Sequence, residues 1–179
     1  CDLAISALAN TPGRAASVEL SKGYHDAGDA FGSVILINRD SKDRITGVRD
    51  LSDKVIVAQR GSLQEMLMAE NVIDYKEFRR IASLQEVYRA VEEGLADAAM
   101  VDAETALSYM EGNPDCGLVL LNDMQFQLEE QFRGDRIAGK KGELQLMYFV
   151  NGVIDEVLEN SLYERWFKSY TAYAAELGM

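Results

Sequence analysis

Three polar positions in this sequence could together bind a small zwitterion. Arg14 lies in a tight turn after a predicted strand, where a guanidinium can hold a carboxylate with two parallel hydrogen bonds. Gly61 and Ser62 lie between a predicted strand and a predicted helix, and the exposed N–H groups of a helix start favour an anion. Asp102 follows another strand, at the end where open α/β sheets bind ligands, and its carboxylate suits an ammonium group. An α-amino acid carries both charges, and each needs a partner once it leaves water.

Each position also has an interpretation that involves no ligand. Arg14 could be a solvated charge on a turn, Ser62 could only cap its helix, and Asp102 could be an ordinary helix N-cap. A helix start can cap itself and still present N–H groups, so the two interpretations of Ser62 are compatible. The three positions indicate a zwitterion site only when they are taken together.

The composition disfavours several other classes of function. The 179 residues include 18 basic and 30 acidic side chains, and this net charge of −12 disfavours binding to the phosphate backbone of nucleic acids. No apolar run is long enough to span a bilayer. The only histidine, His25, rules out a histidine cluster, and the two cysteines, Cys1 and Cys116, match neither a disulfide framework nor a zinc-ligand spacing. We therefore expect no metal and no cofactor.

Strands that alternate with helices must position these residues. Apolar runs predict strands at 3–6, 33–37, 55–58, 77–81, 98–101 and 118–121. Residues 10–14 predict a turn, because Pro and Gly occur together there. Capping residues predict helices that start at Ser62, Ser83 and Asp102. This order predicts a mostly parallel α/β sheet, and residues 48–122 could form a small lobe by themselves.

The pattern changes after Asn122. Residues 124–141 are polar and irregular, residues 144–149 predict a strand, and two helices follow. Spacings of three and four place five aromatic residues on one face of the last helix: Tyr163, Trp166, Phe167, Tyr170 and Tyr173. We expect this face to pack into a core. A stacking platform for nucleic-acid bases is the alternative, which the acidic charge disfavours.

Four blocks of this sequence together resemble bacterial extracellular solute-binding proteins of family 3. The run from Cys1 to Tyr24 contains a strand, a short loop, Thr-x-x-Arg at 11–14 and Ser-x-x-Tyr at 21–24. The runs LSDKVIVAQRGSLQEM at 51–66 and VEEGLADAAMVDAETALSYM at 91–110 are similar to two further hallmarks, and YERWFKSY at 163–170 to the usual end. The resemblance covers nearly the whole chain, and the blocks follow the family's order.

The resemblance implies an α/β fold of the two-lobe, type II periplasmic-binding class that closes about a hinge. Residues 1–37 and 123–179 would form the first lobe and residues 38–122 the second, with crossings near Asn38 and Asn122. The ligand would lie in the cleft between the lobes. In the family pattern, Arg14 holds the ligand carboxylate and Asp102 its amine. The remaining implied ligand-binding residues are Ser6, Ala9, Gly61, Ser62, Leu63 and Gln64.

The sequence departs from the family pattern at three points. Ala9 stands where the family usually has Ser or Thr, and Leu63 stands where it often has Thr or Ser, so two polar contacts are lost. The family's first strand and helix would precede Cys1, so we expect an incomplete first lobe. Such a lobe would expose sheet edges and apolar surface, which favours a partner segment or a homodimer that exchanges elements.

Three functions are compatible with this resemblance. The first is capture of a polar amino acid for the permease of an ABC importer, in the periplasm or outside the cell. Cys1 could then be a lipid-modified anchor or simply an interior strand residue. The second is a ligand-sensing domain of a membrane receptor. The third is an enzyme similar to cyclohexadienyl dehydratase, which would need a general acid such as Glu65 or Glu104.

Overall fold

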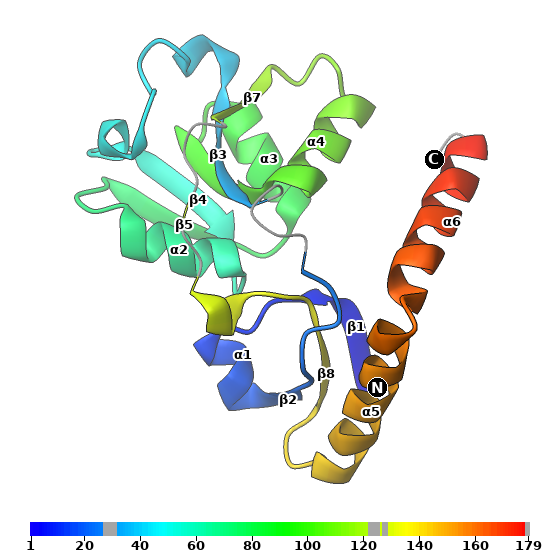
Figure 1. The fold of residues 1–179 in the computed structure, drawn as a ribbon. Coiled ribbons are helices and arrows are strands. Elements are labelled where there is room, and N and C mark those ends of the chain that lie inside the picture. Colours follow the sequence, from blue (N-terminus) through cyan, green and yellow to red (C-terminus); the bar gives the residue numbers. More distant parts are fainter. Residues whose placement is uncertain (27–31, 122–125, 127–128, 178–179) are drawn as a thin grey trace. The chain divides into compact units, whose positions relative to one another are not determined.

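The computed structural model describes residues 1–26, 32–121, 126 and 129–177 (Figure 1). Two compact units make up the chain: unit 1 comprises Cys1–Asp26 with Glu129–Met179, and unit 2 comprises Ala27–Leu128. The chain is a mixed α/β protein, as the alternation of predicted elements indicates. Among the helices described, none is both long and apolar enough to cross a membrane.

Unit 2 is built on a sheet whose described strands follow the order β5-β4-β6-β3-β7. The central strand pair β4 and β6 is parallel, as is β4 with β5, whereas β3 is antiparallel to both β6 and β7. The strands are β3 (Ser33–Asn38), β4 (Val55–Gln59), β5 (Glu77–Ile81), β6 (Ala98–Asp102) and β7 (Leu118–Leu121). The helices are α2 (Leu63–Asn71), α3 (Leu84–Glu92) and α4 (Ala103–Gly112), with short 3-10 turns at Arg39–Ser41 and Val48–Leu51.

Both faces of this sheet are covered by helices, so its central strands are apolar on both sides. Alternate residues of β3 point to opposite faces. Ile35 and Ile37 pack in a cluster with residues of α2, whereas Val34 and Leu36 pack with residues of α3 and α4. This arrangement explains why 33–37 reads as a continuous apolar run rather than as an alternating one.

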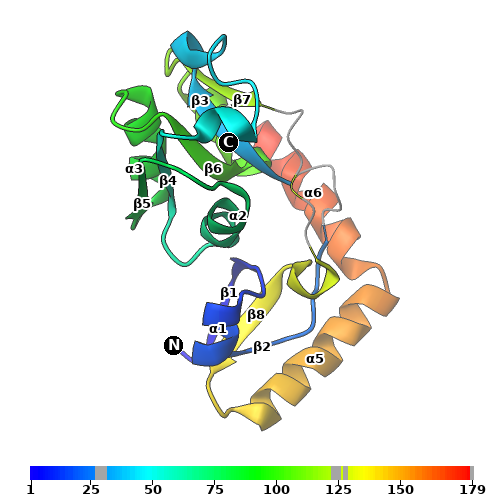
Figure 2. The same cartoon turned by 90° about the vertical axis from the view of Figure 1, so that its left-hand side faces the viewer.

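Unit 1 contains a smaller sheet of the described order β1-β8-β2, in which β1 and β2 both run antiparallel to β8. Helix α5 lies along this sheet (Figure 2) and buries Met147, Val150 and Ile154 against Leu3 and Ile137. The spacing of three and four residues places these three side chains on one helix face. The elements are β1 (Leu3–Leu8), α1 (Pro12–Ser17), β2 (Val18–Leu20), a 3-10 turn (Glu130–Phe132), β8 (Arg136–Lys140), α5 (Leu144–Glu159) and α6 (Leu162–Glu176).

The predicted starts of α2, α3 and α4 are confirmed, and three other predictions are wrong. The predicted turn at 10–14 contains the start of α1, where Thr11 is the N-cap and Pro12 occupies the first turn, a position that suits its missing N–H. Residues 144–149 begin α5 instead of forming a strand, because a short apolar run fits either element until tertiary contacts decide. The region predicted as irregular contains β8, whose pairing partners β1 and β2 lie more than a hundred residues earlier.

The division of the chain differs from the predicted lobe boundaries. Residues up to 37 were expected in the first lobe, but β3 pairs with β6 and β7 and therefore belongs to unit 2. The physical reason is that β3 lies inside the larger sheet, where both of its edges form hydrogen bonds. The second predicted crossing, near Asn122, falls outside the described residues.

The aromatic face of α6 is not buried as expected. Trp166, Phe167, Tyr170 and Tyr173 are each exposed by half or more. Tyr163 stacks on the ring of His25 at a centroid distance of 4.6 Å. The prediction that this face packs into a core is therefore wrong for the described chain, although Phe167 also stacks on His25 at a centroid distance of 6.2 Å.

Candidate functional site

Unit 1 contributes a half-buried guanidinium at the expected position. The Nη1 atom of Arg14 donates to the carbonyl of Ala9 at 3.1 Å, and its backbone N–H donates to the Thr11 hydroxyl at 3.3 Å. Burial lowers the pKa of the Arg14 guanidinium from its ordinary value. No described residue accepts a hydrogen bond from its Nε or Nη2 atom. The guanidinium is thus held through Nη1, and its Nε and Nη2 donors remain available for an anion.

The other two predicted residues of unit 1 have different surroundings. Ala9 contributes its carbonyl to Arg14, so its role in the structure is to hold the guanidinium. Ser6 is exposed on β1, next to a break in the β1–β8 register between Ile5 and Leu8. Ala7 has a φ of 46° at this break, a conformation that is unusual for a residue with a side chain.

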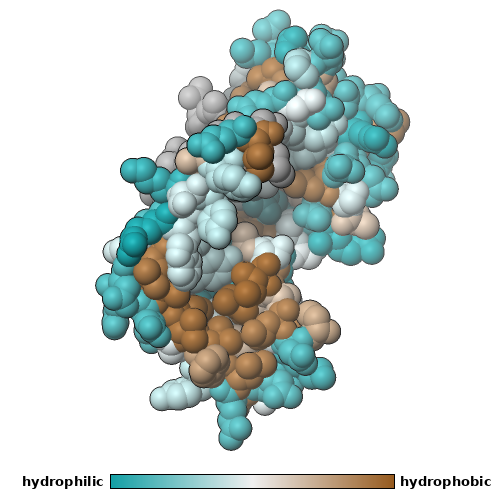
Figure 3. All heavy atoms as spheres, turned by 90° about the vertical axis from the view of Figure 1, so that its right-hand side faces the viewer, coloured by the Kyte–Doolittle hydropathy of each residue, from teal (hydrophilic) through white to brown (hydrophobic). Residues whose placement is uncertain are grey.

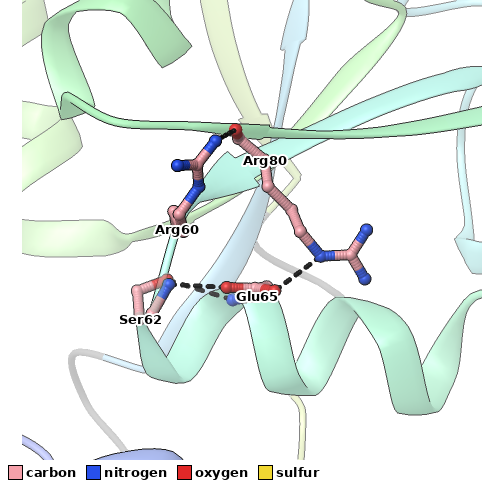
Figure 4. A network of polar contacts seen from close by, with 5 residues as sticks. Arg60, Ser62, Glu65 and Arg80 are labelled. Atoms are coloured by element: carbon pink, nitrogen blue, oxygen red, sulfur yellow. Dashed lines mark hydrogen bonds and ion pairs between the residues drawn. The ribbon is translucent and has the colours of Figure 1, made fainter.

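In unit 2, residues at the start of α2 form a network of polar contacts (Figure 4). The Ser62 hydroxyl accepts from the Glu65 N–H at 3.0 Å, and the Gly61 N–H donates to Glu65 Oε2 at 2.6 Å. Arg80 Nε donates to Glu65 Oε1 at 2.6 Å, and its guanidinium lies 4.4 Å from the centre of the Phe78 ring. The predicted N–H donor of Gly61 is therefore already bound to a carboxylate of the chain itself.

Two other donors remain at this helix start. The N–H groups of Leu63 and Gln64 lie in the first turn, where a helix offers no backbone acceptor, and no described residue accepts from them. The Leu63 side chain packs against the core cluster that faces α2. Leu63 can therefore contribute its backbone and not its side chain to a ligand site.

Asp102 caps α4 and still keeps an oxygen for a ligand. Its Oδ1 atom accepts from the Thr105 N–H at 3.0 Å and from the Thr105 hydroxyl at 3.1 Å. No described residue donates to Oδ2. The N-cap interpretation of Asp102 is thus confirmed, and it leaves room for the second role. Burial raises the pKa of the Tyr88 hydroxyl, which lies near Asp102 and Thr105.

The sheet brings Asp102 and the start of α2 to one end of unit 2. Because β4 and β6 are parallel neighbours, their carboxyl ends lie at the same end of the sheet. The antiparallel strand β3 begins at this end of the sheet, where Ser33 pairs with Asp102. Gln64 Nε2 donates to the Ser33 hydroxyl at 3.2 Å. The sequence reasoning missed Ser33, although a polar residue that opens an apolar strand was a usable signal.

The two candidate general acids are differently placed. Each carboxylate oxygen of Glu65 accepts one hydrogen bond, from the Gly61 N–H and from Arg80 Nε. Glu104 is exposed in the first turn of α4, and its side chain forms no hydrogen bond with any described residue. Among the described residues, no group of three or more His, Cys, Asp or Glu side chains could hold a metal ion.

Solved structures similar to this chain are binding proteins. AbpA, an amino acid ABC transporter substrate-binding protein from Streptococcus pneumoniae bound to L-arginine, has a TM-score of 0.74 and 22% identity over 94% of this chain and 67% of its own. The truncated, arginine-bound ArgBP from T. maritima has a TM-score of 0.68 and 27% identity over 87% of this chain and 68% of its own.

A third similar structure is the ancestral amino acid-binding protein AncCDT-1, described as a precursor of cyclohexadienyl dehydratase. It has a TM-score of 0.71 and 23% identity over 94% of this chain and 67% of its own. No protein-family model matches the chain. The structural agreement over nearly the whole chain shows that this protein has the α/β fold of the two-lobe, periplasmic-binding-type proteins.

Proposed function

We propose that this chain captures a polar amino acid or a similar zwitterion for the permease of an ABC importer. Asp102 carries the proposal, because its Oδ1 is bound by Thr105 while its Oδ2 has no donor among the described residues. The carboxylate is thus held in one orientation with one oxygen left for an ammonium group. Delivery to a permease would place the protein in the periplasm or outside the cell.

Arg14 supplies the opposite charge in this proposal. Its free Nε and Nη2 donors can bind the two oxygens of the ligand carboxylate side by side. The unoccupied N–H groups of Leu63 and Gln64 would assist, since a helix start favours an anion. Neither charge of the ligand would then leave water without a partner, which would otherwise cost several kcal/mol per ion.

A thermal-shift screen against the twenty amino acids tests this function. A ligand that binds only the native state raises the melting temperature by mass action. We expect a clear shift with at least one polar amino acid, and isothermal titration should give an affinity about tenfold weaker in Arg14→Lys, which loses one of two charge-assisted hydrogen bonds. Arg165→Lys, at an exposed position of α6, is the matched control and should bind normally. The absence of any shift would contradict the proposal.

We also propose that unit 1 associates with further protein, as a partner segment or a second copy. Strand β1 is an edge of its sheet, and the apolar residues Ile5, Tyr148 and Phe149 are 66, 84 and 67% exposed. Hydrophobic side chains gather over α5 (Figure 3). Open edges and large apolar patches of this kind favour association. Sedimentation should therefore detect a dimer at micromolar concentration, and Phe149→Glu should weaken it. A monomer at all concentrations would contradict self-association.

A further inference from the structure

The exposed aromatic face of α6 has the spacing of a coiled-coil seam. Trp166, Tyr170, Tyr173 and Leu177 follow one another at intervals of four, three and four residues, and they are 51, 70, 58 and 57% exposed. The Leu177 N–H donates to the Tyr173 carbonyl at 3.2 Å, so the helical course reaches the last of them. A repeat of 3.5 residues keeps such side chains directed at a second helix. These four residues are called the α6 seam below.

Unit 1 itself covers only the beginning of this face. Tyr163, three residues before Trp166, stacks on the His25 ring at a centroid distance of 4.6 Å, and Phe167 stacks on the same ring at 6.2 Å. Beyond this point the side chains of the α6 seam are more than half exposed. An apolar stripe of this kind usually packs against another element.

The charges on α6 disfavour a lipid surface as the element that covers the seam. The helix carries two basic side chains, Arg165 and Lys168, and two acidic ones, Glu164 and Glu176. Helices that lie on membranes are rich in Lys and Arg on their polar face. The net charge of −12 on the chain would also be repelled by anionic headgroups. A protein helix is therefore the better occupant.

Side-chain size along the seam fits a second copy of α6 that runs in the opposite direction. In an antiparallel pair centred between Tyr170 and Tyr173, each tyrosine faces the other tyrosine of the second copy. Trp166 then faces Leu177 of the second copy, so the largest side chain of the seam meets an aliphatic one. A parallel pair would instead place the two indoles in one layer. Cores pack best when large and small side chains alternate across the contact.

The residues beside the seam agree with the antiparallel direction. Phe167 and Ala174 flank it on one side, so each phenyl ring would cover an alanine of the second copy. Ser169 and Glu176 flank it on the other side, where a hydroxyl can donate to a carboxylate. Opposite directions also oppose the two helix macrodipoles.

We propose that α6 packs antiparallel against α6 of a second copy of this chain, through the α6 seam. The contact names a surface for the association proposed for unit 1, and it does not depend on ligand capture. It is separate from the edge of β1 and from the exposed residues of α5. Four seam residues from each helix form a small contact, so we expect reversible association at micromolar concentration.

Sedimentation velocity over a concentration series, combined with tryptophan fluorescence, tests this contact. Trp166 is the only tryptophan, so a blue shift of its emission that follows the monomer–dimer curve reports burial of the seam itself. Tyr170→Glu places a carboxylate in the seam and should weaken dimerisation by about tenfold or more, with loss of the blue shift. Thr171→Glu makes the same charge change one residue later, at an exposed position away from the seam, and should dimerise like the wild type.

Three outcomes of this experiment would overturn the seam contact. The first is a monomer at all concentrations, and the second is equal weakening by Tyr170→Glu and Thr171→Glu. The third is a dimer that Phe149→Glu disrupts and Tyr170→Glu leaves intact, which would preserve the association of unit 1 through α5. Both glutamate variants should melt at the wild-type temperature, because both positions are exposed. Flotation of a monomer with phosphatidylcholine vesicles would assign the face to lipid and also overturn the contact.

Spin labels determine the direction of the pair. Glu164 and Thr171 lie seven residues apart on the same side of α6, and Cys116 is buried, so a Cys1→Ser chain can be labelled at Glu164→Cys or Thr171→Cys alone. In the antiparallel pair the labels at 171 lie side by side, whereas those at 164 are separated by about 20 Å along the helix axis. Electron–electron distance measurements should show this difference. Equal distances at the two positions would indicate a parallel pair and overturn the proposal.

Discussion

Asp102→Asn should strongly weaken amino-acid binding while the free protein stays nearly as stable as the wild type. Asn and Asp are about equally good N-caps, so the hydrogen bond to the Thr105 N–H can persist and α4 should remain capped. The ammonium group of the ligand, however, loses its anionic partner. Removing one member of a desolvated charge pair costs about 2–5 kcal/mol, so we expect affinity to fall by about 30-fold or more in titration calorimetry.

Asp115→Asn is the matched control for this charge change. Asp115 is exposed and precedes β7, which pairs with the far end of β3, away from Ser33. This variant should bind like the wild type. Asp102→Ala adds a second comparison, because it removes the cap and should also destabilise the free protein by about 1 kcal/mol. Undiminished binding by Asp102→Asn would exclude the carboxylate as the ammonium partner.

Ile35→Ala should lower the stability of unit 2 more than any surface substitution. Ile35 lies in the middle of β3, has no exposed surface, and packs in the cluster between the sheet and α2. Replacing a fully buried Ile with Ala removes apolar contacts and leaves a cavity, which costs about 2–5 kcal/mol. Denaturant unfolding monitored by circular dichroism should show a lower midpoint with little change in slope.

Ile73→Ala is the matched control for the cavity. Ile73 follows α2 and is 73% exposed, so its removal creates no cavity and should change stability by about 0.5 kcal/mol or less. Equal effects of the two variants would contradict the burial of β3 within the sheet of unit 2. A large effect of Ile35→Ala alone would also support the assignment of β3 to unit 2 instead of the predicted first lobe.

Local sequence determined the helix starts and most of the strands of unit 2. Ser62, Ser83 and Asp102 each accept from the N–H three residues on, as their spacing predicted. This success has a physical cause, because a cap satisfies backbone donors within its own turn and needs no distant partner. The apolar runs of β3, β4 and β6 were also readable, since a strand buried on both faces carries few polar residues.

Tertiary structure alone decided how these elements pack and which hydrogen-bonding groups remain available for a ligand. The apolar run at 144–149 could form a strand or a helix, and α5 resulted because Met147, Val150 and Ile154 share one face against the sheet of unit 1. The segments at 62–65 and 83–86 are both Ser-Leu-Gln-Glu, yet the Gln64 side chain bonds to Ser33 whereas that of Gln85 bonds to no described residue. Ser33 lies 31 residues from Gln64 along the chain, so only the pairing of β3 with β6 beside α2 brings them together. The sequence by itself therefore determined the local caps and the candidate charges, whereas long-range packing decided which donors and acceptors remain for a ligand.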